Sequence, residues 1–130
     1  MSIAPKITTI TGPGNPGWLG SAHGTDATRT VTLDVSKFTA GTHYPDGFIR
    51  GGTPVAKITA TGKFGPYTPA DTTTGLGVLV GFVYGDFPVD GQTKLVVAAV
   101  LDHGKVREAR LPIAIDADGK TDVAGRIQFV

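Results

Sequence analysis

Residues Thr28–Phe38 read TRTVTLDVSKF, a stretch in which apolar and polar side chains alternate. Val31, Leu33 and Val35 would share one face of an extended chain, with threonine, aspartate and serine side chains on the other face. A period of two residues is typical of a strand that buries one side. The stretch therefore predicts a half-buried β-strand and favours a β-rich fold.

The rest of the chain indicates several more strands. The apolar run Leu76–Val83 has no polar face, so we expect a strand buried on both sides, in which Gly77 and Gly81 permit bends or close backbone approach. Residues 92–113 predict a hairpin that turns at Asp102–Lys105. Further strands are expected at Phe48–Arg50, Pro54–Thr61 and Gly125–Val130, with a turn at Pro45–Gly47, a polar loop at Pro69–Gly75 and one helical turn within Asp116–Gly125.

The composition supports an all-β fold, meaning a β-dominated domain with at most one short helix. The 130 residues include 19 glycines and 9 prolines, and only 18% are charged, which suits short strands and turns better than long helices. The formal net charge is +1 without a dense Lys/Arg run, so neither nucleic acid nor a membrane is an expected partner. The chain has no cysteine, which excludes disulfides and cysteine metal sites.

Residues 1–27 are expected to form an extended arm, followed by one β-rich domain over residues 28–130. Isolated isoleucines stand among threonines and prolines, and then a Gly/Pro/Asn patch leads to Trp18 and Leu19. Such a segment cannot bury its own apolar side chains. The opening residues, MSIAPKITTITG, also lack the basic start and continuous apolar stretch of an ordinary secretory signal, so we expect the protein to stay in the cytoplasm where it is made.

The patch GPGNPG, residues 12–17, matches the spacing of the dinucleotide-binding fingerprint G-x-G-x-x-G. That fingerprint works only where a strand leads into a helix whose free N–H groups bind a pyrophosphate. Pro13 and Pro16 each remove a backbone donor, and no helical pattern follows. We interpret the match as accidental.

The remaining polar residues form no recognisable catalytic or metal-binding pattern. The histidines are isolated in turns, Asp102 and His103 are adjacent and should point apart, the serines lack a nucleophile elbow, and the aspartates near Gly119 lack the glutamate of a calcium loop. We therefore expect no catalytic residue, no cofactor and no metal, and a function in binding or structure. The residues considered are His23, His43, His103, Asp102, Ser2, Ser21, Ser36, Asp116, Asp118 and Asp122.

Residues 47–130 resemble the head decoration proteins of tailed bacteriophages, the family typified by the lambda head protein D. The resemblance lies in the order GFIRGGTPVAKITATGKFGPYTPADTTTG, GLGVLVGFVYGDF and LPIAIDADGKTDVAGRIQFV, and the long N-terminal part is similar to versions from phages of actinobacteria. It implies a β-tulip-like domain that forms homotrimers at three-fold and quasi-three-fold sites on the outer surface of the expanded capsid. It further implies a partner, the major capsid protein, a role in stabilising the head against DNA pressure, and no enzymatic activity or cofactor. The protein would then be found on the virion, and in the host cytoplasm during assembly.

The arm suits such a role, because an extended apolar segment can add a strand to an exposed sheet edge of a capsid protein. The expected capsid-binding residues are Ile3, Pro5, Ile7, Ile10, Pro13, Trp18 and Leu19. Two alternatives stay open. One is a virion-surface module that binds carbohydrate or a receptor through exposed Trp18, Tyr44 and Tyr67, and the other is a small enzyme using Asp102 and His103.

Overall fold

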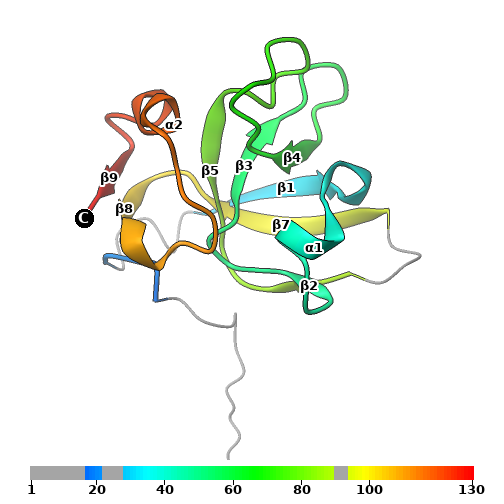
Figure 1. Cartoon of the computed structure of the whole chain (residues 1–130), viewed down its shortest axis with the longest axis horizontal. Helices are drawn as coiled ribbons and strands as arrows, with labels where there is room; N and C mark the ends of the chain where they lie inside the picture. The colour runs from blue at the N-terminus through cyan, green and yellow to red at the C-terminus, as the bar shows by residue number, and fades with distance from the viewer. Residues whose placement is uncertain (1–16, 22–27, 90–93) are drawn as a thin grey trace, which may run out of the picture.

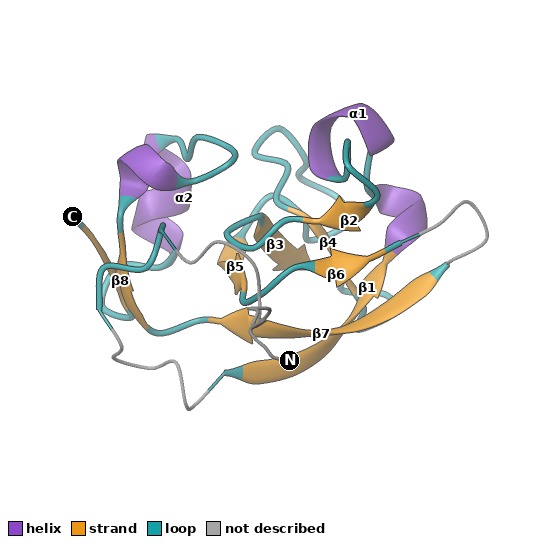
Figure 2. Ribbon diagram, turned by 90° about the horizontal axis from the view of Figure 1, so that it is seen from below, coloured by secondary structure: helices purple, strands orange, loops and turns teal. Residues whose placement is uncertain are grey.

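The computed structural model describes residues 17–21, 28–89 and 94–130, and within them the fold is dominated by β-structure, as the sequence predicts (Figures 1 and 2). Five strands form a closed barrel in the order β1-β4-β3-β5-β7, with β7 pairing back onto β1. The barrel strands are β1 (Arg29–Asp34), β3 (Pro54–Lys57), β4 (Phe64–Pro66), β5 (Leu79–Val83) and β7 (Leu95–Leu101). Two smaller sheets pair β2 (Phe48–Ile49) with β6 (Phe87–Pro88), and β8 (Gly104–Val106) with β9 (Ile127–Phe129).

The expectation of at most one short helix is wrong. Within the described ranges there are two, α1 (Ala40–His43) and α2 (Ala117–Asp122), together with the 3₁₀ turns η3 (Val35–Lys37) and η4 (Glu108–Arg110). Helix α2 is the helical turn expected in Asp116–Gly125. Helix α1 is a single turn closed locally by the Thr39 N–H, which donates to His43 Nδ1 over 2.8 Å, and so short a helix leaves no periodic pattern in the sequence.

Strand β1 confirms the alternation that predicts it. Val31 and Leu33 are buried in the barrel and pair with Ala98 and Val96 of β7. The strand ends at Asp34, earlier than expected, because the Asp34 carboxylate accepts hydrogen bonds from the backbone N–H and the hydroxyl of Ser36 and starts the turn η3.

Strand β5 is buried on both faces, which confirms the prediction from its apolar run. Val80 and Val83 pack with the barrel core, whereas Leu79 and Phe82 belong to a second core outside the barrel. A bulge explains this arrangement, since Val55 of β3 pairs with Gly81 while the next residue, Ala56, pairs with Leu79. The extra residue shifts the alternation by one position, so that each core receives two large side chains from one short strand.

The expected hairpin at Asp102–Lys105 is wrong, because β7 and β8 do not pair. Both edges of β7 are already occupied, by β1 and by β5. The chain instead turns away at Gly104, whose φ of 139° suits glycine, and β8 pairs in parallel with β9. The Arg126 guanidinium holds this connection by donating to the carbonyls of Val80 (2.9 Å) and Asp102 (2.8 Å).

The other predicted elements are present with shorter bounds. Strand β2 lies within Phe48–Arg50, and β3 begins at Pro54, the position where a strand tolerates proline, but ends at Lys57. It ends there because Ile58 closes a tight turn, accepting from the Gly62 N–H and donating to the Lys63 carbonyl, both over 2.8 Å. The turn at Pro45–Gly47 is closed by the Gly47 N–H, which donates to the Tyr44 carbonyl.

The close contact of β5 with β7 at Gly81 can be tested. A Cβ atom at Gly81 would overlap the Leu101 carbonyl oxygen and lie 2.9 Å from Val100 Cγ1. We expect Gly81→Ala to lower the free energy of unfolding by about 1–3 kcal/mol in urea denaturation, because the two strands must separate. Gly41→Ala is the matched control, since a Cβ there meets nothing within 4 Å, and it should be neutral or stabilise by up to about 1 kcal/mol. Equal effects of the two substitutions would contradict this packing.

Candidate functional site

Trp18 is the first strongly buried side chain of the described residues, with only 3% of its surface exposed. Its ring packs near Phe82, with ring centroids 6.1 Å apart, and approaches Gly52 closely, since a Cβ at Gly52 would lie 3.1 Å from two atoms of the indole. The expectation that Trp18 belongs to an unburied arm is therefore wrong. Trp18 belongs to the second core, between β5 and the C-terminal elements, and nothing in the sequence around Trp18 indicates that packing.

The two residues after Trp18 add a short extended segment to β8. Leu19 forms an antiparallel bridge with Val106, and the Gly20 N–H donates to the Lys105 carbonyl over 2.9 Å. The Arg107 N–H donates to the Trp18 carbonyl. For Trp18 and Leu19, the strand addition that the sequence suggested for a partner is thus made within the chain itself.

The other expected arm residues lie outside the described residues. They are Ile3, Pro5, Ile7, Ile10 and Pro13, and the glycine and proline patch before Gly17 lies there too, as do Ser2 and His23. What the structure places is the point where this segment joins the domain, at Trp18.

The aspartates near Gly119 tie α2 to the barrel. Asp116 caps the helix by accepting from the Gly119 N–H (2.9 Å), and the same oxygen accepts from the Tyr67 hydroxyl (2.7 Å). Asp122 accepts from the Leu79 N–H of β5 over 2.9 Å. In the described part of the chain, no group of three His, Cys, Asp or Glu side chains is placed to hold a metal ion. These carboxylates act as structural acceptors in the described contacts, and the Asp–Gly pair lies in the first turn of α2.

These contacts change the acidity of both partners. The hydrogen bond from Tyr67, followed by that from the Gly119 N–H, holds the pKa of Asp116 below its ordinary value of 3.8. Burial, followed by the hydrogen bond to Asp116, raises the pKa of the Tyr67 hydroxyl well above its usual range. The pair therefore keeps a neutral phenol donating to an ionised carboxylate at neutral pH.

The residues considered for hydrolytic chemistry make separate contacts. The Asp102 carboxylate lies 3.9 Å from Arg29, and the Ser36 hydroxyl donates to Asp34 over 2.6 Å. His43 accepts from Thr39 and stacks edge-on against Phe38, with ring centroids 5.4 Å apart, and burial lowers its pKa. None of these described contacts joins a serine, a histidine and a carboxylate.

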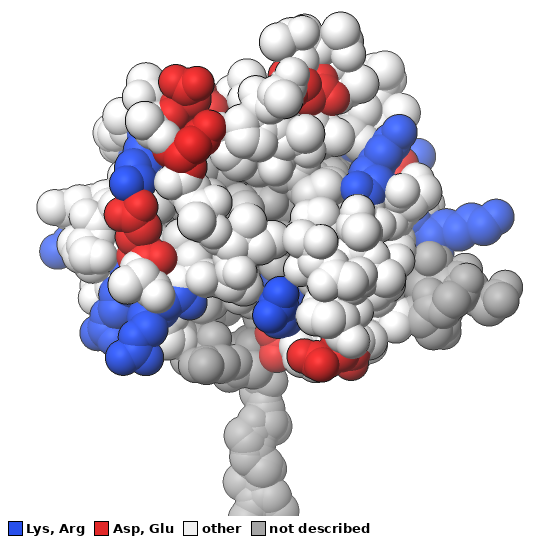
Figure 3. Space-filling model, in the orientation of Figure 1, with Lys and Arg blue, Asp and Glu red and all other residues white. Residues whose placement is uncertain are grey.

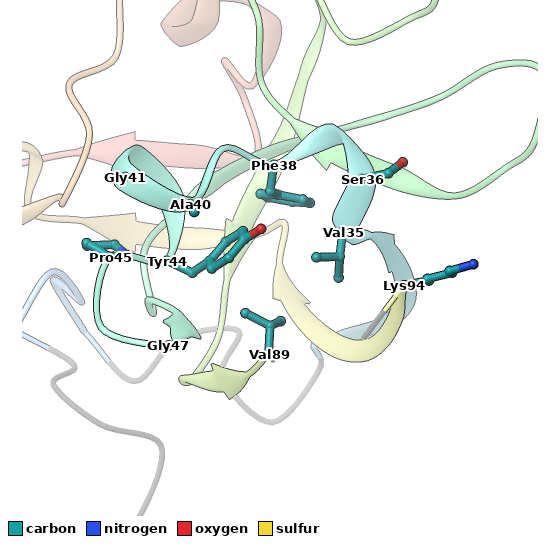
Figure 4. A pocket seen from close by; sticks show the side chains of 10 residues that line it. All are labelled: Val35, Ser36, Phe38, Ala40, Gly41, Tyr44, Pro45, Gly47, Val89 and Lys94. Atoms are coloured by element: carbon teal, nitrogen blue, oxygen red, sulfur yellow. The ribbon is translucent and has the colours of Figure 1, made fainter. Parts of the chain in front are cut away.

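A hollow of about 710 Å³ lies where α1, η3 and the start of β7 meet (Figure 4). We call it the Tyr44 hollow. Phe38, Tyr44, Val35 and Val89 point into the same space, whereas Ser36 and Lys94 point away from it. Of the three aromatic residues expected to be exposed for sugar binding, only Tyr44 is partly exposed, while Trp18 and Tyr67 are buried. The expected three-residue aromatic platform is therefore wrong.

Strands β1 and β7 lie side by side (Figure 2), and β7 exposes two apolar side chains on their outer face. Leu95 and Val97 of β7 are 52% and 66% exposed, and Val97 lies opposite Thr32 of β1. Charged side chains on the face shown in Figure 3 stand in small separate groups, with wide uncharged areas between them. Neither described helix has the length and apolar character needed to cross a membrane.

The Tyr67–Asp116 contact predicts a specific loss of stability in acid. Because the pKa of Asp116 is lowered by folding, its contribution is present above pH 3.8 and is lost as the pH falls through the folded-state pKa. Asp116→Asn should therefore lower the thermal unfolding midpoint at pH 7 and narrow the difference between the midpoints at pH 7 and pH 3. Asp118→Asn, on the exposed side of the same helix, is the control. If both variants narrow the difference between the midpoints at pH 7 and pH 3 equally, the Tyr67–Asp116 contact is not the cause of the loss of stability in acid.

Comparison with known proteins adds no relative. A scan against protein-family models finds no match to the chain, and a search of curated proteins finds none either.

Proposed function

We propose that this is a structural virion protein, a trimeric decoration protein that binds the major capsid protein on the outer surface of a phage head and stabilises the head against internal DNA pressure. The observation that supports the proposal is the burial of Trp18 and the pairing of Leu19 with β8, which anchor the chain directly after the apolar residues 1–16. The proposed capsid-binding arm is accordingly residues 1–16, shorter than the sequence suggested. Its role is binding, without catalysis or a cofactor.

The arm has the composition of a strand donor. Ile7, Ile10 and the threonines between and beside them are β-branched residues, which favour extended structure. A segment of this kind can pair with the exposed sheet edge of a capsid protein, where its backbone supplies affinity and its isoleucines fill pockets. Pro5, Pro13 and Pro16 restrict the unbound chain and so reduce the entropy lost on binding.

Self-association would make the binding strong. Three arms on one trimer bind with a high effective concentration, and they engage together only where three acceptor edges stand at the right separation. The outer face of β1 and β7 is our candidate for the contact between copies, because Leu95 and Val97 are apolar side chains of one strand that are more than half exposed. The resemblance to phage decoration proteins supports the same assembly.

A carbohydrate-binding module is the second candidate, and the Tyr44 hollow is the observation that favours it. Phe38 and Tyr44 give that hollow two aromatic walls, and its volume falls within the range of small-ligand sites. Glycan-array binding by the full chain that is lost in Tyr44→Ala, without any affinity for capsids, would favour this function over decoration.

Deleting Ser2–Gly14 tests the arm. The deletion leaves Gly17, Trp18 and Leu19 in place, so the domain should keep its thermal unfolding midpoint. Binding to decoration-free capsids, assembled from the major capsid protein of the same phage, should weaken by roughly 100-fold or more, because three linked contacts are lost together. Sedimentation with capsids measures the affinity. A deletion that continued through Trp18 would remove part of the second core and is therefore not a clean test.

A second variant tests the arm's side chains separately from its length. A variant that replaces Ile3, Ile7 and Ile10 with serine keeps the arm's length and should weaken binding in the same direction. A chain without Ser2–Gly14 that still binds capsids with full affinity would refute the role of the arm.

Val97→Lys tests the contact between copies. A lysine on the β1–β7 face would place like charges together in a symmetric assembly and should convert the trimer to a monomer of unchanged fold. Light scattering of the full chain in solution measures the mass. Val78→Lys is the matched control, because Val78 is 58% exposed but lies outside β7. Dissociation by Val78→Lys and not by Val97→Lys would place the contact elsewhere.

A further inference from the structure

A second hollow, of about 280 Å³, lies beside Trp18, and we call it the Trp18 hollow. Its apolar walls come from Trp18, Phe48 and Pro112, and its polar lining comes from Arg50, Asp86 and Arg110. Gly17 also lines it, so the hollow adjoins the place where residues 1–16 join the domain.

The charges of this hollow are not balanced within the described chain. Asp86 is occupied by the backbone, since its Oδ1 accepts from the Gly51 N–H over 2.7 Å. Among the described residues no ion pair joins Asp86 to Arg50 or to Arg110. Among the described lining residues, two guanidinium groups and one carboxylate therefore leave one unmatched positive charge.

Arg50 has donor capacity that the described contacts do not use. Its Nη2 donates to the Thr42 carbonyl over 3.1 Å, while its Nε is buried and has no hydrogen-bond partner among the described residues. A buried donor without a partner is costly and is usually satisfied by water or a ligand. Arg110 is exposed and takes part in no described ion pair.

We propose that the Trp18 hollow binds a carboxylate carried on a short aliphatic stem. A guanidinium group matches a carboxylate with two parallel hydrogen bonds, and one negative charge balances the unmatched positive charge. A phosphate dianion fits less well, because Asp86 would repel its second charge. The walls of Trp18, Phe48 and Pro112 suit a stem of a few methylene groups, as in an acidic side chain or a small fatty acid.

The test titrates the full chain with butyrate, which has this chemistry, and separately with butyramide, its neutral analogue. Isothermal titration calorimetry measures the binding in both cases. We expect butyrate to bind saturably and butyramide not to bind. Arg110→Gln should weaken it roughly tenfold, the loss expected for a charge-assisted hydrogen bond. Arg107→Gln, an exposed arginine three positions away that does not line the hollow, should leave it unchanged. Absence of saturable butyrate binding, or equal weakening by both substitutions, would overturn the proposal.

A second experiment distinguishes whether the carboxylate belongs to the capsid partner or to a free acid. Weaker capsid binding by Arg110→Gln and not by Arg107→Gln would assign the carboxylate to an acidic side chain of the capsid partner. If a variant no longer binds butyrate but binds capsids as before, the carboxylate belongs to a free acid. The butyrate result does not depend on capsids, so the hollow and the proposed decoration function can fail separately.

Discussion

The burial of β5 on both faces is the constraint on which the rest of this structure depends. A five-residue strand supplies large side chains to two different cores, and the bulge at Val80 and Gly81 makes this possible. The barrel alone would leave Leu79 and Phe82 facing water. Covering them requires a second layer, which α2, β8, β9 and the segment at Trp18 provide. The C-terminal elements and the start of the described chain are therefore parts of one hydrophobic arrangement.

Much of the β-structure could be predicted because its causes are local. Three local patterns each indicate how the strand that contains them is buried or where it begins. They are the alternation around Val31 and Leu33, the unbroken apolar run at β5 and the proline at the start of β3. The pairing of β8 could not be predicted in this way. A hairpin is the usual outcome for adjacent strands, and only the occupation of both β7 edges by β1 and β5 rules it out.

The candidate sites likewise divide into features with local causes, which the sequence indicates, and features that depend on residues distant in the sequence. Trp18 stands among glycines, prolines and asparagine, a context typical of an exposed segment, and its burial depends on Phe82 and Gly52, which are distant in the sequence. The Trp18 hollow was not predicted for the same reason, since it joins Arg50 and Arg110 from unrelated parts of the chain. The role of Asp116 as a helix cap follows more directly from the sequence. An aspartate directly before a helix commonly accepts from a backbone N–H of the first turn, here that of Gly119.

The attachment at Trp18 also determines how force on the N-terminal segment would reach the domain. Tension on residue 17 acts first on the indole held by Phe82 and on the hydrogen bonds that join Trp18 and Gly20 to β8. These contacts lead directly into the second core and, through β5, into the barrel. A segment attached only through the loop before β1 would instead pull on β1 alone. An anchor that distributes tension over both cores suits the proposed function, in which the N-terminal segment holds a capsid protein in place.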